Sequence, residues 1–208
     1  MAPAVPRSPS PGTRRTGCST RRRTHGWKGQ PLPYERFVDH DDELRRSLPT
    51  PPRPRGGYVP AVRHGHRSGV TGLVMTAGMT PRVDGVIQYQ GQVGRDLTVA
   101  EARTAAGIAA DNALAAALAS LGRGQRLDRV LRLTVYVNAA AGFEEHTAVA
   151  DGASDRLLEL LGERSGAARA AVGVTSLPGG ACVEVELTCA WWAPERPAVP
   201  QAGGLADT

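Results

Sequence analysis

The fold is decided by residues 168–186, which read A-R-A-A-V-G-V-T-S-L-P-G-G-A-C-V-E-V-E. Side chains alternate in character on both sides of the turn at Pro178-Gly179-Gly180, and a period of two indicates β-strands. We expect the two strands to pair as an antiparallel hairpin. In that register Arg169, Glu184 and Glu186 share one face, because directly opposed residues lie on the same side of a sheet.

Charges on such a hairpin are ordinarily solvated on the open side of an antiparallel sheet. Here the small residues Ala171 and Gly173 are expected to leave a recess between the charges, where a ligand or another backbone could approach. An arginine fork also matches the two oxygens of a carboxylate. The charged face is therefore a candidate carboxylate site, with Arg169 as its anchor.

This stretch resembles the C-terminal signature of the RidA/YjgF family, small trimeric enamine/imine deaminases with the older names endoribonuclease L-PSP and translation inhibitor. The most specific mark is an arginine followed fifteen positions later by a glutamate across a Leu-Pro turn, which Arg169 and Glu184 match. The resemblance covers residues 44–192 and indicates a longer RidA-like subgroup. Its other motifs are Gly57-Tyr58-Val59-Pro60, the strand at 73–78, Gly91-Gln92-Val93-Gly94 and Asp151-Gly152-Ala153-Ser154-Asp155.

Periodicity predicts the remaining elements of the domain. Strands are expected at 58–63, 73–78 and 128–138, with a short hairpin at 83–90. Helices are expected at 98–121, where Thr98 and Glu101 form a capping box, and at 143–161. This order indicates an α+β fold, with two helices on one face of a mainly antiparallel sheet. The resemblance implies a chorismate-mutase-like (RidA-type) fold and a barrel-like homotrimer with sites in clefts between subunits.

Charge and composition predict four parts: a disordered basic extension rich in Pro and Arg (1–35), a lead-in segment (36–56), the RidA-like domain (57–193) and a flexible C-terminal tail (194–208). The net charge is +5, and seven of the 25 basic residues precede the first acidic residue, Glu35. The body of the chain is thus nearly neutral. We interpret the extension as without function, with a nucleic-acid-binding arm around Arg21-Arg22-Arg23 and an organellar targeting segment as alternatives.

Composition also indicates a single soluble domain. No apolar stretch approaches the roughly 20 residues needed to span a bilayer, and a chain of 208 residues can bury one core. Cys182 and Cys189 are too far apart on one predicted strand to bridge, which favours a reducing compartment, and we expect the cytoplasm. His64 and His66 share a strand face, but no further ligand with metal-site spacing is near, so no metal is expected.

The resemblance implies hydrolysis of 2-aminoacrylate-type 2-imino acids to 2-oxo acids and ammonia, the reaction of a 2-iminobutanoate/2-iminopropanoate deaminase, without a cofactor. In this interpretation Arg169 and the Ala171 N–H hold the substrate carboxylate, and Glu184 orients the attacking water and relays a proton. Tyr58 of a neighbouring subunit and the Gly78 backbone line the cleft. The alternatives are a non-catalytic, small-carboxylate-binding or regulatory trimer and an endoribonuclease, although no nucleic-acid or membrane partner is expected.

Two positions depart from the pattern of the family. Ala171 stands where many active members have a cysteine, and Met79 stands where a glutamine follows the glycine of the second strand. Ala171 still offers its backbone N–H. Met79 removes a polar group from the expected cleft, which shifts the expected substrate toward something more apolar.

Overall fold

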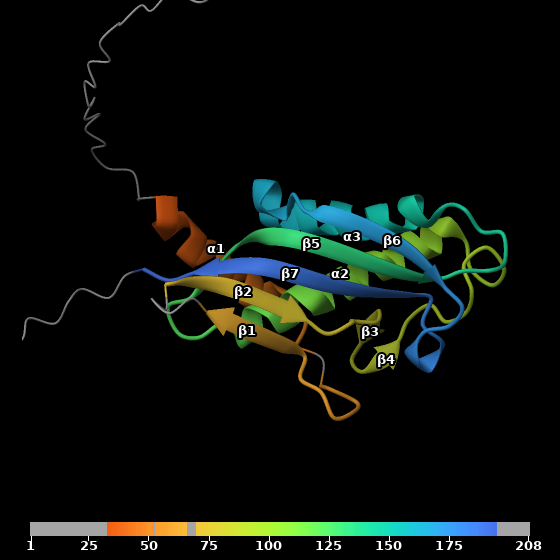
Figure 1. The fold of residues 1–208 in the computed structure, drawn as a ribbon, viewed down its shortest axis with the longest axis horizontal. Helices are drawn as coiled ribbons and strands as arrows, with labels where there is room; N and C mark the ends of the chain where they lie inside the picture. The colour runs from red at the N-terminus through yellow and green to blue at the C-terminus, as the bar shows by residue number, and fades with distance from the viewer. Residues whose placement is uncertain (1–32, 52, 66–69, 195–208) are drawn as a thin grey trace, which may run out of the picture. The chain divides into compact units, whose positions relative to one another are not determined.

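The computed structural model describes residues 33–51, 53–65 and 70–194 (Figure 1). The predicted extension up to residue 32 and the tail from residue 195 lie outside the described residues. Two 3-10 turns occur at Gly162–Ser165 and Pro178–Gly180. The other elements, in chain order, are α1 (Pro33–Ser47), β1 (Ala61–Gly65), β2 (Thr71–Thr76), β3 (Arg82–Val83), β4 (Val86–Ile87), α2 (Val99–Ser120), β5 (Arg126–Asn138), α3 (His146–Leu161), β6 (Ala168–Val174) and β7 (Val183–Trp192).

Five strands form one sheet in the order β1-β2-β7-β5-β6. All neighbours are antiparallel except β5 and β6, which are parallel. The predicted hairpin is therefore wrong, because β5 lies between β6 and β7. The physical reason is the preceding helix: β5, α3 and β6 form a strand–helix–strand crossover, and such a connection pairs its two strands in parallel.

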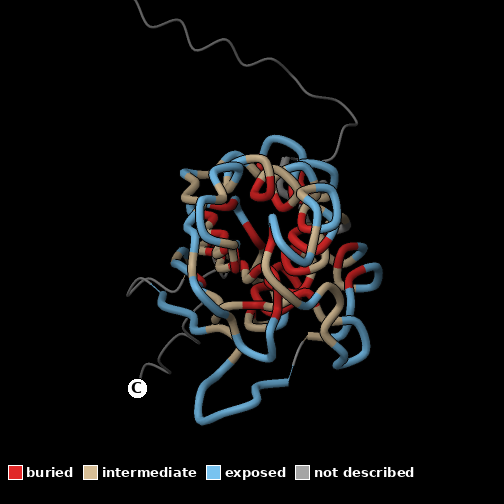
Figure 2. Tube along the Cα trace, turned by 90° about the vertical axis from the view of Figure 1, so that its right-hand side faces the viewer, coloured by how far each residue is buried: buried red, intermediate tan, exposed pale blue. Residues whose placement is uncertain are grey.

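The two predicted helices, α2 and α3, cover one face of the sheet (Figure 1). The capping box is confirmed at the start of α2, where the Glu101 N–H donates to Thr98 Oγ1 at 3.2 Å and the Thr98 N–H donates to Glu101 Oε2 at 2.8 Å. Buried alanines run along α2 and let it lie close to the sheet. The buried residues gather between the helices and the sheet (Figure 2), as expected for the predicted α+β fold.

A pair of glycines marks the contact between α2 and α3. A Cβ built on Gly152 of α3 would stand 2.1 Å from the carbonyl oxygen of Arg103 in α2. A Cβ built on Gly107 of α2 would stand 3.6 Å from the carbonyl oxygen of Gly152, an ordinary van der Waals distance. Gly152 therefore allows the backbones of the two helices to approach closely.

Helix α1 is an element that the sequence did not lead us to expect in the lead-in segment. Asp41 is fully buried, accepts a hydrogen bond from the Leu127 N–H at 2.8 Å, and pairs with Arg164 Nη1 at 2.9 Å. Leu44 and Leu48 enter the hydrophobic core. The helix is thus fastened to the start of β5 and to the turn after α3 by one buried ion pair and by apolar contacts.

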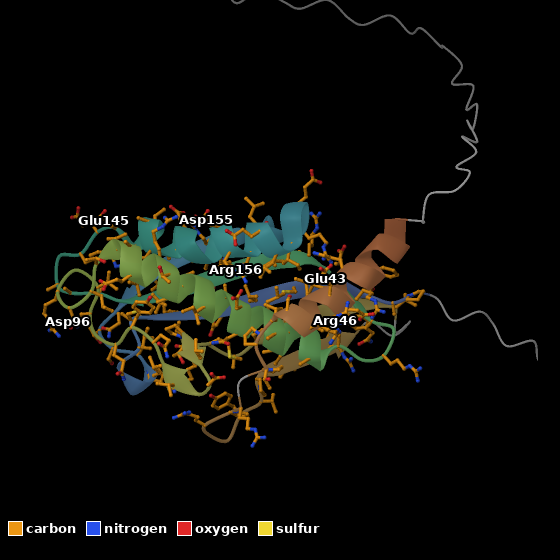
Figure 3. All side chains as sticks on the ribbon, turned by 180° about the vertical axis from the view of Figure 1, so that it is seen from behind. Glu43, Arg46, Asp96, Glu145, Asp155 and Arg156 are labelled. Atoms are coloured by element: carbon orange, nitrogen blue, oxygen red, sulfur yellow. The ribbon has the colours of Figure 1, made fainter. Side chains whose placement is uncertain are left out.

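The outer side of the helix layer is charged, and Figure 3 shows Asp155 and Arg156 on it. Arg156 Nε pairs with Asp111 of α2 at 2.7 Å, and Arg103 of α2 pairs with Asp155 at 2.6 Å, so ion pairs link the two helices. Within residues 33–194, as far as they are described, no helix has the length and apolar character to cross a membrane. No helix of the described residues covers the opposite face of the sheet, and the candidate site lies there.

Candidate functional site

Glu184 lies on the open face of the sheet. Along β7 buried and half-buried residues alternate, which puts Val185 and Leu187 in the core and Glu184 and Glu186 on the open side. Glu184 is opposite Tyr136 of β5 in the register, and the Tyr136 hydroxyl donates to Glu186 Oε2 at 3.0 Å. The alternation predicted for this strand is confirmed. These three side chains form a polar strip across the middle of the face.

The environment favours protonation of Glu184. Burial and the nearby Glu186 carboxylate raise the pKa of Glu184, because both disfavour its ionised form. Within the described part of the chain, no side chain or backbone group forms a hydrogen bond or ion pair with the Glu184 carboxylate. A carboxyl group with a raised pKa and unused oxygens is suited to exchanging protons with a ligand.

Tyr136 remains a hydrogen-bond donor beside this group. Burial, together with its hydrogen bond to Glu186, raises the pKa of the Tyr136 phenol, so the hydroxyl stays protonated at neutral pH. Because that hydroxyl is directed to Glu186, it does not satisfy Glu184. The two glutamates of the strip therefore differ: one is held by a tyrosine and the other is open to a ligand.

Gly78 lies against the Glu184 side chain. The loop after β2 is fixed on β7 by two hydrogen bonds between the backbones of Met79 and Val185, at 2.8 and 2.9 Å. A Cβ built on Gly78 would stand 2.5 Å from both Cδ and Oε1 of Glu184. The close approach of this carboxyl group requires a glycine at position 78.

A pocket of about 90 Å³ opens beside Glu184. Tyr58, Gly78, Met79 and Glu184 line it, so three of the predicted site residues meet in a single chain. Tyr58 comes from the loop before β1, which starts at Ala61 rather than at the predicted residue 58. The Met79 side chain lines the pocket but is only 5% exposed, so it contributes little polar or apolar surface for a ligand.

Three arginines that were not predicted from the sequence also line this pocket: Arg53, Arg55 and Arg82. The first two lie in the Pro-Pro-Arg-Pro-Arg stretch at 51–55, and alternate residues of an extended chain project to the same side. The spacing of two residues between Arg53 and Arg55 was the sequence signal that could have identified them. Arg82 begins β3, and the Asn112 amide of α2 donates to the carbonyl oxygens of Thr80 and Arg82 at 3.1 and 3.0 Å, which fixes its backbone.

Arg169 lies on the other face of the sheet, so its predicted shared face with Glu184 and Glu186 is wrong. Parallel pairing sets it opposite the buried Leu133, toward the helices. Two strand spacings and three residues along the strands separate the backbones of Arg169 and Glu184, about 14 Å at ordinary sheet dimensions. A single chain does not bring these two residues together.

Asp151 and Ser154 of α3 hold the Arg169 guanidinium. Nη1 donates to Asp151 Oδ1 at 2.7 Å and to Ser154 Oγ at 2.9 Å. Nε and Nη2 of Arg169 make no hydrogen bond to any residue that the structure describes. The guanidinium is thus oriented by one nitrogen and retains donors for a ligand.

Ala171 and Gly173 lie on the same side of β6 as Arg169. Ala171 is opposite Val135 and packs against the core. A Cβ on Gly173 would stand 2.4 Å from His146 Nε2 of α3, so this glycine accommodates a helix side chain. The prediction that Ala171 and Gly173 leave a recess between the charges of Arg169, Glu184 and Glu186 is therefore wrong. Among the described residues no group of three or more His, Cys, Asp or Glu side chains could hold a metal ion, and His66 lies outside them.

Comparison with known proteins places this chain in a family. Residues 60–187 match the family described as "YjgF/chorismate mutase-like, putative endoribonuclease". Protein TCP17 of Trypanosoma cruzi is 40% identical over 140 residues, which are 67% of this chain and 84% of TCP17.

Two solved structures agree with that match. Atu1372 of Agrobacterium tumefaciens, a protein of unknown function, has a TM-score of 0.63 at 33% identity and covers 75% of this chain and 97% of its own. A Shewanella oneidensis protein with the same endoribonuclease designation has a TM-score of 0.61 at 28% identity and covers 72% and 97%. By sequence and by fold, the chain belongs to the YjgF/chorismate mutase-like family, as the spacing of Arg169 and Glu184 predicted.

Proposed function

We propose that this protein hydrolyses reactive 2-imino acids, the tautomers of 2-aminoacrylate-type enamines, to 2-oxo acids and ammonia. The observation that carries the proposal is Glu184, a half-buried carboxyl group with a raised pKa, unpaired within the described part of the chain, at a pocket lined by Tyr58 and Gly78. Such a group can take a proton from a ligand and return it. An iminium carbon is already electrophilic, so the reaction calls for a positioned water and a proton carrier.

The proposed chemistry uses Glu184 twice. Water adds to the iminium carbon as its proton passes to the Glu184 carboxylate, which gives a carbinolamine. The protonated Glu184 then donates to the carbinolamine nitrogen. The carbon–nitrogen bond breaks, ammonia leaves with the bonding electrons, and the hydroxyl proton passes to it, so that a 2-oxo acid and ammonium are the products.

The substrate carboxylate is proposed to bind Arg169 and the Ala171 N–H of a neighbouring copy of the chain. Three features support a site between copies in a homotrimer: the separation of Arg169 from Glu184 within one chain, the unused Nε and Nη2 of Arg169, and the position of β6 at the edge of the sheet. The assignment of subunits differs from the expectation for Tyr58, which lies beside Glu184 of its own chain.

The open face supplies a surface for such an assembly. Large apolar side chains are exposed on it beside the polar strip, and an exposed apolar patch is typical of an interaction site. With their exposed fractions they are Val62 (52%), Leu73 (37%), Met75 (42%), Leu131 (41%) and Val172 (38%). Covering this face would also shield the Glu184 pocket from bulk water.

Ammonia release from 2-aminoacrylate generated in situ tests the activity. We expect the wild-type protein to accelerate release over buffer, and Glu184→Ala and Arg169→Ala each to abolish the effect. Asp151→Asn removes the charge of one of the two groups that orient Arg169, and with it the ion pair of Asp151 with Arg103, and should retain part of the activity. A wild-type rate equal to that of buffer would refute the proposed activity for this substrate.

Mixing the two inactive variants tests the proposed location between copies. Random assortment of Glu184→Ala and Arg169→Ala subunits restores both residues at about one interface in four, so about a quarter of wild-type activity should return after unfolding and refolding together. If each site were built within one chain, the mixture would stay inactive. Refolded wild-type protein is the control.

A second candidate is a non-catalytic, carboxylate-binding or regulatory trimer, which the arginines around the pocket favour. It predicts that a small carboxylate raises the melting temperature in wild type and not in Arg169→Ala, without turnover of any imine. The third candidate, RNA cleavage, is suggested by the designation of the family and of the Shewanella oneidensis protein. Incubation with single-stranded RNA, with Glu184→Ala as the comparison, separates it from contaminating nuclease.

A further inference from the structure

Two of the pocket arginines converge on one backbone carbonyl. Arg55 Nη2 and Arg82 Nη1 both donate to the oxygen of Gly85, at 2.8 and 2.9 Å. Arg82 also donates from Nε to Thr80 Oγ1 at 3.1 Å, which fixes the direction of its fork. Arg53 lines the same pocket. We call these three residues, Arg53, Arg55 and Arg82, the arginine cluster.

The cluster carries positive charge that the described residues do not neutralise. None of its members has a carboxylate within 4.0 Å in the described part of the chain, whereas Arg103 and Arg156 on the helix layer each pair with an aspartate. Burial and the neighbouring Arg55 charge lower the pKa of Arg82. An anion placed between the guanidinium groups would relieve this repulsion.

The cluster joins the pocket of Glu184 to a second, wider groove. The same three arginines line a groove of about 490 Å³ that continues along Pro49, Asp84 and Asn112. A ligand whose reacting carbon lies at Glu184 can therefore extend its far end past the guanidinium groups. The pocket at Glu184 alone, at about 90 Å³, holds only a small acid.

We propose that the arginine cluster binds a second anionic group of the substrate, so that the preferred substrates are 2-imino acids with an acidic side chain, the imino dicarboxylates. This inference rests on the proposed function, in which Arg169 of a neighbouring copy holds the first carboxylate. Guanidinium forks bind planar carboxylates through two parallel hydrogen bonds, and such charge-assisted bonds are strong. The preference expected earlier from Met79, for more apolar substrates, is replaced by one for charge.

The kinetic test compares two imines that differ only in a distal carboxylate. 2-Iminoglutarate and 2-iminobutanoate are generated in situ from L-glutamate and L-2-aminobutanoate by amino-acid oxidases, and their hydrolysis is followed. We expect the wild-type kcat/KM to be about tenfold to a hundredfold higher for 2-iminoglutarate, the range for one charge-assisted hydrogen bond. Arg82→Gln and Arg55→Gln should lose that preference, because kcat/KM should fall far more for 2-iminoglutarate than for 2-iminobutanoate. Equal wild-type values for the two imines would overturn the inference.

Two controls keep the kinetic result interpretable. Arg123→Gln removes a positive charge from an exposed loop that lines neither cavity, so it should keep the preference. Arg55 lies on an exposed segment, so Arg55→Gln tests the cluster even if Arg82→Gln disturbs β3 and β4. Loss of preference in Arg123→Gln as well would assign the effect to net charge and refute a site.

A binding measurement separates this inference from the proposed activity. Isothermal titration of wild type with glutarate and with butanoate should show tighter binding of the dicarboxylate, and Arg82→Gln should bind both alike. If no imine is hydrolysed but glutarate binding depends on Arg82, the proposed activity fails and the anion site stands. If imines are hydrolysed without preference and glutarate binds no tighter than butanoate, the anion site fails and the activity stands.

Discussion

The contact between Gly78 and Glu184 can be tested by adding a single methyl group, in Gly78→Ala. A Cβ at position 78 would stand 2.5 Å from Cδ and Oε1 of Glu184 and 2.9 Å from Cγ. Non-bonded carbon atoms pack at about 3.5–4.0 Å. In Gly78→Ala the Glu184 carboxyl group must therefore withdraw by about 1 Å.

The expected effect falls on catalysis rather than on stability. Misplacement of a catalytic group by about 1 Å costs about a hundredfold in rate, so kcat/KM should drop by about that factor. The clash involves the end of a flexible side chain, and Gly78 has no positive φ that would strain an alanine. The free energy of unfolding should thus change by less than about 1 kcal/mol, since alanine also lowers the entropy of the unfolded chain.

Aminoacrylate-dependent ammonia release and urea unfolding measure the two quantities. Gly107→Ala is the matched control, because its Cβ meets only ordinary contacts of 3.6 Å or more on the helix side of the sheet. It should keep wild-type kcat/KM. Wild-type activity in Gly78→Ala, with stability preserved, would show that the position of the Glu184 carboxyl over Gly78 does not matter for the reaction.

Other predictions concern stability and assembly. Because its pKa is raised, the ionised form of Glu184 destabilises the folded protein at a pH above the folded-state pKa. This penalty vanishes at a pH below the ordinary glutamate pKa of about 4.3. Glu184→Gln should therefore raise the free energy of unfolding at pH 7 and leave it unchanged at pH 3.5. Asp41→Ala leaves the Arg164 guanidinium buried without its carboxylate and should cost about 3–5 kcal/mol in urea unfolding, whereas Asp42→Ala, whose side chain is 46% exposed, should cost less than about 1 kcal/mol. A loss for Asp42→Ala equal to that for Asp41→Ala would contradict this difference. Analytical ultracentrifugation should give about three times 21.9 kDa for wild type and a smaller species for Met75→Glu, and a wild-type monomer would rule out the trimer.

Local signals in the sequence were sufficient where neighbouring residues determine the structure. The capping box of Thr98 and Glu101 located the start of α2, and the alternation after Ala181 located the buried and open sides of β7. The spacing of Arg169 and Glu184 identified the family. In each case the residues that carry the signal lie within one helix turn, one strand or one short sequence motif.

Strand pairing could not be read from the turn at Pro178 alone. A short turn between two strand-like segments resembles a hairpin. The pairing depends on β5, which is distant in sequence and is paired with β6 along one edge and with β7 along the other. The helix between residues 138 and 168 was predicted, but its consequence for strand pairing was missed, because a helix between two strands favours parallel pairing of those strands. Because of this parallel pairing, Arg169 lies on the helix side of the sheet and Glu184 lies on the open side.

The residues around the pocket were missed for a similar reason. Arg53 and Arg55 follow α1, whose Asp41 pairs with Arg164, 123 residues away in the chain, and Arg55 also donates to the Gly85 oxygen, 30 residues away. Asn112 fixes the backbone at Arg82 from the middle of an alanine-rich helix. Contacts of such long sequence separation leave no periodic signal in a single sequence.

The contact of Gly152 with α2 has a consequence for anyone who wishes to stabilise this protein. A common design rule replaces helical glycines by alanine, and it would select both Gly107 and Gly152. The methyl group fits on α2, but on α3 it would overlap the Arg103 carbonyl, a backbone atom that cannot move without shifting the helix. The two apparently equivalent changes should therefore have opposite effects on stability, and Gly152 has to be kept although glycine is a poor helix former.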